Sequence, residues 1–226
     1  MRYGIIGALE EEVRLVREKM DVTGEKKLLC GTIYSGTVFG QEIVLACAGM
    51  GKVNAALCAH TLIREFGAEA VINIGIAGAM AQEMHTMDVV IGTELRFHDQ
   101  DPCMVKCYPF TDVFYADKTL AALAEKACSA VGLCGKFRSG RVITGDIFIN
   151  DAATKARLVE RFSPLCTEME GAAVAHAAFV NQVPFLVIRT MSDSADDGAD
   201  NSYDNFIDVA ANQSASIILK MLELAE

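Results

Sequence analysis

Two acidic side chains far apart in the sequence have the chemistry of an acid–base pair. Glu12 ends the run Glu10-Glu11-Glu12, and Asp193 follows the apolar segment 185–188. Cleavage of an N-glycosidic bond to a purine needs a proton for the departing base and a water molecule delivered to the sugar carbon. An acid and a base each contribute roughly 10²–10⁴-fold to such a reaction, as paired carboxylates do in glycoside hydrolases.

The surroundings of the two acids assign different roles to them. Partial burial after an apolar strand would raise the pKa of Asp193 and keep it protonated, which favours it as the acid. Glu12, at the end of a first helical turn, is the better candidate for the base that activates water. On spacing alone the ordinary interpretations stay open: a solvated acid in a first turn for Glu12, and a helix or turn cap for Asp193.

Arg189 is the least expected residue, because it stands among apolar residues and a buried guanidinium needs a carboxylate or a polar ligand. We predict that it pairs with Glu170 or Glu12, or hydrogen-bonds the attacking water. Two further carboxylates, Glu168 and Glu170, bracket the thioether of Met169 just before a stretch of small residues. They add polar groups to the same candidate site.

Weaker motifs point to other chemistries and are not favoured. The run 49–52 (GMGK) resembles a phosphate loop, but its spacing is wrong and Val53 stands where a magnesium-binding hydroxyl is needed. No GxGxxG follows the first strand, so a dinucleotide site is not expected. His98, Asp99, Asp101, Cys103 and Cys107 could be metal ligands, although mixed residues of this kind are more often plain loop. We expect neither a metal nor a cofactor.

Along the chain, short β-rich runs alternate with helical patterns, which is typical of an α/β domain. Ligands in such domains bind beyond the carboxyl ends of strands, and polar junctions occur at 8–12, 75–78, 145–150 and 189–193. The predicted strands are 2–7, 28–38, 42–48, 70–76, 87–97, 136–144 and 184–191, with a hairpin turn at 39–41, a glycine turn at 75–78 and a loop at 98–116. Helices are predicted from residue 10 and over 51–66, 120–131, 151–162 (capped by Asp151), 170–181 and 202–224.

Length and composition set the broad class of protein. The 226 residues, of which 52% are hydrophobic and 22% charged, predict a single domain over 1–226. A formal net charge of -10 argues against nucleic-acid binding. Eight cysteines without a CxxC pair predict buried thiols in a reducing compartment. Neither a signal peptide nor a membrane span is recognised, so we expect a cytoplasmic protein without membrane contact.

Five ordered motifs together resemble the bacterial 5′-methylthioadenosine/S-adenosylhomocysteine nucleosidases, a family of the nucleoside phosphorylase superfamily. They are GIIGALEEEV (4–13), GMGKVNAA (49–56), TGDIFI (144–149), EME (168–170) and RTMSD (189–193), and the match is collinear over nearly the whole chain. The resemblance implies a three-layer α/β/α sandwich around a mixed, partly barrelled sheet, normally as a homodimer. It also implies hydrolysis of the N-glycosidic bond of an adenine thionucleoside, without a cofactor.

The resemblance implies a role for each matching residue. Glu12 would activate the water with help from Arg189, and Asp193 would protonate adenine at N7. The implied substrate-binding residues are Ile147, Phe148 and Ile149 with Ser192 at the base, Glu168, Met169 and Glu170 at the ribose, Leu9, Met50 and Phe206 in the alkylthio pocket, and Gly78, which would let the backbone approach the ligand. For Met169, Met50 and Phe206 plain core packing is the alternative interpretation.

Some positions differ from the family and leave the substrate open. Ile76 stands where a small hydroxyl residue is common, Leu9 where Met is usual and Met50 where Ile is usual, and the 98–116 loop is shorter and contains cysteines. The run GIAGA (75–79) is also similar to the futalosine hydrolases. A phosphorylase of the same superfamily is disfavoured, because the three glutamates at 10–12 would repel phosphate. A non-catalytic nucleoside-binding protein remains a further alternative.

Overall fold

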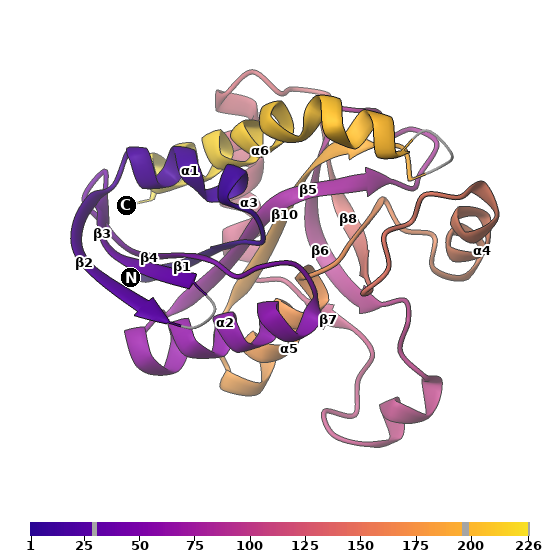
Figure 1. Cartoon of the computed structure of the whole chain (residues 1–226), viewed down its shortest axis with the longest axis horizontal. Helices are drawn as coiled ribbons and strands as arrows, with labels where there is room; N and C mark the ends of the chain where they lie inside the picture. The colour runs from indigo at the N-terminus through magenta and orange to yellow at the C-terminus, as the bar shows by residue number, and fades with distance from the viewer. Residues whose placement is uncertain (29–30, 196–198, 226) are drawn as a thin grey trace.

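The computed structural model describes residues 1–28, 31–195 and 199–225, and it is a mixed α/β fold (Figure 1). Its strands are β1 (Arg2–Gly7), β2 (Asp21–Leu28), β3 (Gly31–Val38), β4 (Gln41–Cys47), β5 (Ala70–Ala79), β6 (Val89–Phe97), β7 (Phe114–Tyr115), β8 (Phe137–Thr144), β9 (Cys166–Glu168) and β10 (Phe185–Asp193). Its helices are α1 (Glu10–Glu18), α2 (Lys52–Phe66), the 3₁₀ turn η1 (Pro102–Lys106), α3 (Lys118–Ala130), α4 (Ala152–Phe162), α5 (Gly171–Asn181) and α6 (Ala199–Leu224).

The strands form one sheet that closes on itself over part of its width. In the order β10-β6-β8-β9-β5 each strand pairs with the next, and β10 also pairs with β5, so these five strands make a closed barrel. From β5 the sheet continues outward through β1, β4, β3 and β2. Parallel pairs such as β1–β5 and β10–β5 occur beside antiparallel pairs such as β10–β6. The predicted mixed, partly barrelled sheet is therefore confirmed.

Helices cover both faces of this sheet and give the three predicted layers. On one face α1 and α3 pack with the long α6, and on the other α2 packs with α5 (Figure 1). Each face has its own apolar core, one centred on residues such as Ile5, Ile72 and Ile218 and the other on Ile6, Leu62 and Val174. Ala172, Ala175 and Ala178 are fully buried, so the small residues of α5 let that helix lie close to the sheet.

Several predicted local features are confirmed. The β3–β4 hairpin is antiparallel, and Phe39 and Gly40 in its turn both have positive φ, as a type I′ turn requires. Asp151 caps α4 by accepting a hydrogen bond from the Thr154 amide at 2.8 Å. Among the described residues no helix is long and apolar enough to cross a membrane.

Other predictions were wrong or incomplete. The glycines at 75–78 do not form a turn, because β5 runs on to Ala79 and pairs there with β9. Three strands were missed: β2, whose residues 21–27 are exposed and mostly polar, and the short strands β7 and β9. The 98–116 loop contains η1 and the short strand β7.

Candidate active site

The carboxyl ends of the strands bring the candidate residues to one cavity. β1, β5 and β10 run parallel, and Gly78 of β5 pairs with Asp193 of β10, so their ends meet at one edge of the barrel. β8 and β9 end together there, because Thr144 pairs with Glu168. The main cavity, at this edge, is lined by Ala8, Leu9, Glu12, Met50, Ile76, Ala77, Gly78, Phe148, Thr167, Glu168, Met169, Glu170, Ser192 and Asp193. An adjoining cavity shares six of these residues and adds Ile147 and Ile149.

Glu12 is buried at the cavity rather than solvated, with 3% of its surface exposed. Its Oε2 accepts hydrogen bonds from the Ala8 and Leu9 amides at 2.6 and 3.0 Å, and its Oε1 accepts one from the Ile76 amide at 3.1 Å. Burial raises the pKa of Glu12, while the charge of Arg189 and these three amides oppose the rise. The interpretation of Glu12 as an ordinary surface acid is therefore wrong.

Asp193 is buried on the other side of the same cavity, with 1% of its surface exposed. Its Oδ2 accepts a hydrogen bond from the Ser192 hydroxyl at 2.7 Å, and its Oδ1 accepts one from the Ala195 amide at 2.8 Å. The second contact is of the turn-capping kind, so Asp193 both caps a turn and lines the cavity. Glu12 and Asp193 thus share one cavity although 181 positions separate them in the sequence.

Arg189 lies beneath the cavity and is 1% exposed. Its Nη2 donates to Glu168 and to the side-chain oxygen of Asn73, and it is 3.9 Å from Glu170 Oε2. Burial disfavours its charge, but Glu168, Glu170 and Glu12 together raise the pKa of Arg189, so it remains a cation. The predicted pairing with Glu170 is present at this longer distance, whereas the nearest carboxylate is Glu168, which the sequence did not single out as a partner. The predicted hydrogen bond to the attacking water stays a prediction.

Glu168 is held by the fold itself as well as by Arg189. It accepts a hydrogen bond from the Thr144 hydroxyl, and its Oε2 accepts from the amides of Glu170 and Gly171 at 3.0 and 2.6 Å. These contacts fasten β9 to β8 and to the start of α5. Glu168 lines the cavity, but most of its acceptor capacity is already used inside the protein.

Glu170 is a second buried carboxylate at the site whose pKa is raised. It is 7% exposed, and its Oε1 accepts a hydrogen bond from the Gly51 amide at 2.7 Å. Burial and the neighbouring charge of Glu168 raise the pKa of Glu170 to about 7, against the opposing effects of Arg189 and the Gly51 amide. A carboxylate in this state can exchange a proton near neutral pH.

The other predicted substrate residues fall into two groups. Leu9, Met50, Gly78, Ile147, Phe148, Ile149, Met169 and Ser192 line one or both cavities, and of these Met50 and Ile147 are more than half exposed. The space beside Gly78 is filled from within the protein, since a Cβ there would lie 2.7 Å from Asp193 Oδ1. Phe206, on α6, is 38% exposed and is not among the described residues that line the cavities.

The sequence did not reveal the residues that hold Arg189 and Glu168 in place. Asn73 binds Arg189 and donates to the Ile6 carbonyl at 3.0 Å, and Thr144 binds both Glu168 and the Ala172 amide. Each is a polar residue inside a predicted buried strand, which was the available signal. Lys52 was considered only as part of a phosphate loop, but it pairs with Asp99 and Asp146 at 2.6 and 3.4 Å.

The weaker motifs do not form the sites that they resemble. The amides at the beginning of α2 already bind carboxylates of this chain, Gly51 to Glu170 and Lys52 to Asp146. Among the described residues, no group of three or more His, Cys, Asp or Glu side chains is arranged to hold a metal ion.

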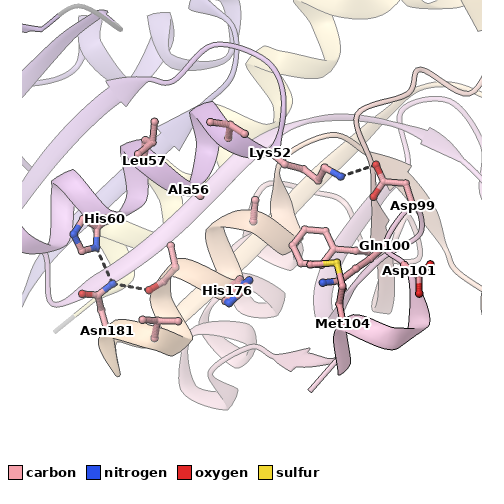
Figure 2. A pocket seen from close by; sticks show the side chains of 15 residues that line it. Lys52, Ala56, Leu57, His60, Asp99, Gln100, Asp101, Met104, His176 and Asn181 are labelled. Carbon is pink, nitrogen blue, oxygen red and sulfur yellow. Dashed lines mark hydrogen bonds and ion pairs between the residues drawn. The ribbon is translucent and has the colours of Figure 1, made fainter. Parts of the chain in front are cut away.

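A separate apolar groove of about 550 Å³ lies between α2, α5 and the 98–107 segment (Figure 2). Val53, Leu57, Met104 and Val180 line it and are 69, 62, 50 and 42% exposed. At one end Lys52 and Asp99 form an ion pair, and at the other Asn181 hydrogen-bonds His60 (Figure 2). Exposed apolar side chains in such a group mark an interaction surface.

Comparison with known proteins gives a consistent result. Residues 2–223 match the phosphorylase superfamily. The chain is 40% identical over 228 residues to the 5′-methylthioadenosine/S-adenosylhomocysteine nucleosidase of Halalkalibacterium halodurans, covering 98% of this chain and 97% of that protein. The nucleosidase of Neisseria meningitidis bound to methylthio-immucillin-A superposes with a TM-score of 0.94 at 34% identity, covering 99% of both chains. The futalosine hydrolase of Helicobacter pylori superposes with a TM-score of 0.92 at 28% identity, covering 100% of this chain and 98% of that one.

Proposed function

The chain belongs to the phosphorylase superfamily and, within it, to the 5′-methylthioadenosine/S-adenosylhomocysteine nucleosidases, which are N-glycosyl hydrolases, and we propose that it works through Glu12 and Asp193. The reaction cleaves the bond between adenine and the thioribose of either nucleoside. Water supplies the new bond to the anomeric carbon, and adenine leaves with a proton.

One observation supports hydrolysis over phosphorolysis most strongly. The described residues that line the main cavity include four carboxylates, Glu12, Glu168, Glu170 and Asp193, and neither a lysine nor an arginine. Arg189 lies behind them and is paired with Glu168. A negatively charged phosphate nucleophile would be repelled by these carboxylates, whereas a neutral water molecule would not be repelled.

In the proposed mechanism the two acids act on opposite ends of the scissile bond. Glu12, fixed by three backbone amides, accepts a proton from the water while the water oxygen bonds to the anomeric carbon. The electron pair of the broken bond passes to adenine, and Asp193 donates a proton to N7. Arg189 keeps the surrounding carboxylates oriented and partly neutralised. Each proton transfer is worth roughly 10²–10⁴-fold.

The remaining residues bind the nucleoside in this proposal. Phe148 stacks on adenine while Ile149, Ile147 and Ser192 contact the base. Glu170 binds the ribose hydroxyls, with Glu168 behind it and Met169 against the sugar. Leu9, Met50 and Phe206 contact the alkylthio group, and Gly78 lies beside the base. For Phe206 the support is the resemblance alone.

A related hydrolysis is the second candidate function. The similarity to futalosine hydrolase extends over the whole chain, and Ile76, whose backbone amide binds Glu12, is an apolar residue that lines the cavity. Both enzymes would use the same acids but release different bases.

We also propose a homodimer, supported by the exposed apolar groove between α2 and α5. A cytoplasmic location is supported by the free thiols of Cys47, Cys103, Cys107, Cys128, Cys134 and Cys166. A single domain over 1–226 is supported by the continuous sheet that contains β1 to β10.

A substrate panel tests the proposed function. The protein is incubated separately with methylthioadenosine, S-adenosylhomocysteine, deoxyadenosine and futalosine, and the released base is measured by chromatography. We expect adenine from the first two substrates. Preferential release of hypoxanthine from futalosine would favour the second candidate, and binding of all four without release of any base would support a non-catalytic binding protein.

A further inference from the structure

We propose that Lys52, Asp99 and Asp146 form a clamp that positions the base-binding segment 145–150 over the nucleoside cavity. They come from three separate places in the chain: the first residue of α2, the segment after β6, and the segment after β8. The inference rests on the proposed function, because the segment contains Phe148. None of the three is a catalytic residue, since none lines the main cavity.

The three residues are joined by a closed set of contacts. Lys52 Nζ lies 2.6 Å from Asp99 Oδ2 and 3.4 Å from Asp146 Oδ2. The Lys52 amide donates to Asp146 Oδ1 at 2.8 Å, and the Asp146 amide donates to Asp99 Oδ2 at 3.0 Å. Figure 2 shows the Lys52 ammonium reaching across the end of the groove to Asp99. Each carboxylate therefore receives a hydrogen bond from a backbone amide and an ion pair from the same cation.

The clamp connects the two halves of the nucleoside site through one rigid helix. Successive amides at the beginning of α2 bind successive parts of the site: Gly51 donates to Glu170 at 2.7 Å and Lys52 donates to Asp146. Glu170 is the proposed ribose ligand, and Asp146 stands two residues before Phe148. The beginning of α2 thus sets the distance between the ribose side and the base side of the cavity.

The base segment is also fixed just before Asp146. The Gly145 amide donates to the Glu168 carbonyl at 3.1 Å, and the His98 imidazole packs against Gly145 so closely that a Cβ there would lie 2.9 Å from its Nδ1. His98 adjoins Asp99, so both residues after β6 touch the base segment. Two consecutive residues of that segment, 145 and 146, are therefore held in place.

Partial burial makes the Lys52–Asp99 ion pair stronger than an ordinary surface pair, whereas Asp146 is 48% exposed. The side chains of Lys52 and Asp99 are 24% and 18% exposed, and the Lys52 ammonium lies 5.7 Å from the centre of the Phe97 ring. Without Lys52 the carboxylates of Asp99 and Asp146 would face each other without a cation. Removing the lysine should therefore displace the base segment rather than only loosen it.

The chain offers a closely matched control. Lys26 Nζ pairs with Glu65 at 2.8 Å and lies 5.3 Å from the centre of the Phe66 ring, but Lys26 does not line either nucleoside cavity. Lys52→Met and Lys26→Met thus remove the same kind of ion pair and ring contact at two places. The sequence has no tryptophan, so Ile147→Trp adds a single fluorescent reporter to the base segment.

The experiment measures adenine release from methylthioadenosine for both lysine variants, and fluorescence anisotropy of the same variants combined with Ile147→Trp. We expect Lys52→Met to raise KM about tenfold or more while kcat changes less than about threefold, because the clamp affects binding before the chemical step. The anisotropy of the reporter should fall. Lys26→Met should change neither quantity.

A double variant makes the inference more specific. Asp146→Asn added to Lys52→Met relieves the repulsion between Asp99 and Asp146. The double variant should therefore raise KM no more than Lys52→Met alone. A KM and an anisotropy for Lys52→Met equal to those of Lys26→Met would overturn the clamp. If the unsubstituted protein releases no adenine, the proposed function fails, while the anisotropy comparison still decides whether the clamp holds the segment. Should Lys52→Met not fold, Asp146→Ala removes the ion pair with Lys52 and the acceptor of the Lys52 amide, and it should likewise raise KM and lower the anisotropy relative to Lys26→Met.

Discussion

Glu12 combines burial with a fixed orientation. The low-dielectric surroundings favour its protonated form, while three backbone amides and Arg189 favour the carboxylate. The opposing effects leave a base whose pKa is above the ordinary value of 4.5 and whose oxygens cannot rotate away. A general base works best when its pKa lies near the operating pH, so this environment suits the role that we propose.

Replacement of this carboxylate should stop the reaction without removing the cavity. We expect Glu12→Gln to lower kcat by roughly 10²–10⁴-fold, because the amide cannot accept the proton of the water. Binding of methylthio-immucillin-A should remain measurable by calorimetry. The matched control is Glu10→Gln, whose side chain is 68% exposed in the same helical turn and should leave kcat unchanged. Equal activity of the two variants would contradict the assignment.

Glu170 should make stability depend on pH in a defined direction. Its pKa of about 7 in the folded protein exceeds the ordinary value of 4.5, so the folded state holds a proton that the unfolded state loses between these two values. The stability from this proton is complete below about pH 4.5 and is lost as the pH rises through 7.

Glu170→Gln should remove this dependence of stability on pH, because the amide is neutral at every pH. The amide oxygen can still accept from Gly51. At pH 8 we expect the variant to have a free energy of unfolding higher than that of the wild type by up to about 3 kcal/mol, because the pKa of Glu170 in the folded protein, about 7, lies above its ordinary value of 4.5. Urea unfolding at pH 5 and pH 8 measures the difference, which should shrink at the lower pH. A difference independent of pH would show that Glu170 titrates normally.

The site also depends on how closely the strands β1, β5 and β10 approach each other. Gly75 of β5 faces Glu12, and a Cβ at this position would overlap Glu12 Oε1 and lie 3.0 Å from its Cδ. Glu12 cannot move aside without losing its amide partners. The glycine is therefore required by the close packing of strand and carboxylate.

Gly75→Ala should consequently reduce activity through displacement of Glu12. We expect kcat to fall at least about tenfold and the free energy of unfolding to fall by about 1–3 kcal/mol, as overpacking does elsewhere. Gly24→Ala on β2 is the control, because its Cβ would meet only ordinary contact, 3.8 Å from Ser35 Cβ. Activity assays and urea unfolding of both variants make the comparison. Retention of full activity by Gly75→Ala would mean that the carboxylate is not fixed as described.

The sequence predicted elements with strong periodic patterns and missed those without them. β1 and α4 were found because apolar runs and an Asp cap are local signals. β2 has exposed polar residues and β9 only three residues, so both depend on pairing with neighbours that are distant in sequence. The turn predicted at residues 75–78 was wrong because the role of these glycines also depends on residues distant in sequence. Gly75 and Gly78 make room for Glu12 and Asp193 within a continuous strand.

The candidate site was predictable to the extent that it lies at strand ends. Glu12 and Asp193 were identified from their positions after strands, and their surroundings suggested the base and the acid. Glu170 was identified from its position just before a stretch of small residues, and its ribose role came from the resemblance. The pairing of Arg189 with Glu168, and its support by Asn73, depend on barrel closure between β10 and β9 through β5. Spacing along the chain contains no information about that closure.

The apolar groove between α2 and α5 leaves large apolar side chains exposed on the surface of the molecule. A second copy seated there would bury Val53 and Leu57 and would also shield the Lys52–Asp99 ion pair from water. We expect Leu57→Glu to convert the proposed dimer to a monomer in sedimentation velocity. Val22→Glu, at an exposed position on β2, should leave the oligomeric state unchanged. A wild-type protein that sediments as a monomer would contradict the dimer.

The source of the oxygen on the sugar product distinguishes hydrolysis from phosphorolysis. Methylthioadenosine is converted by the wild-type protein in phosphate-free water enriched in the heavy isotope of oxygen, and the sugar product is analysed by mass spectrometry. We predict one heavy oxygen on the anomeric carbon and a rate that added phosphate does not increase. A reaction that requires phosphate and yields the sugar 1-phosphate would contradict the account.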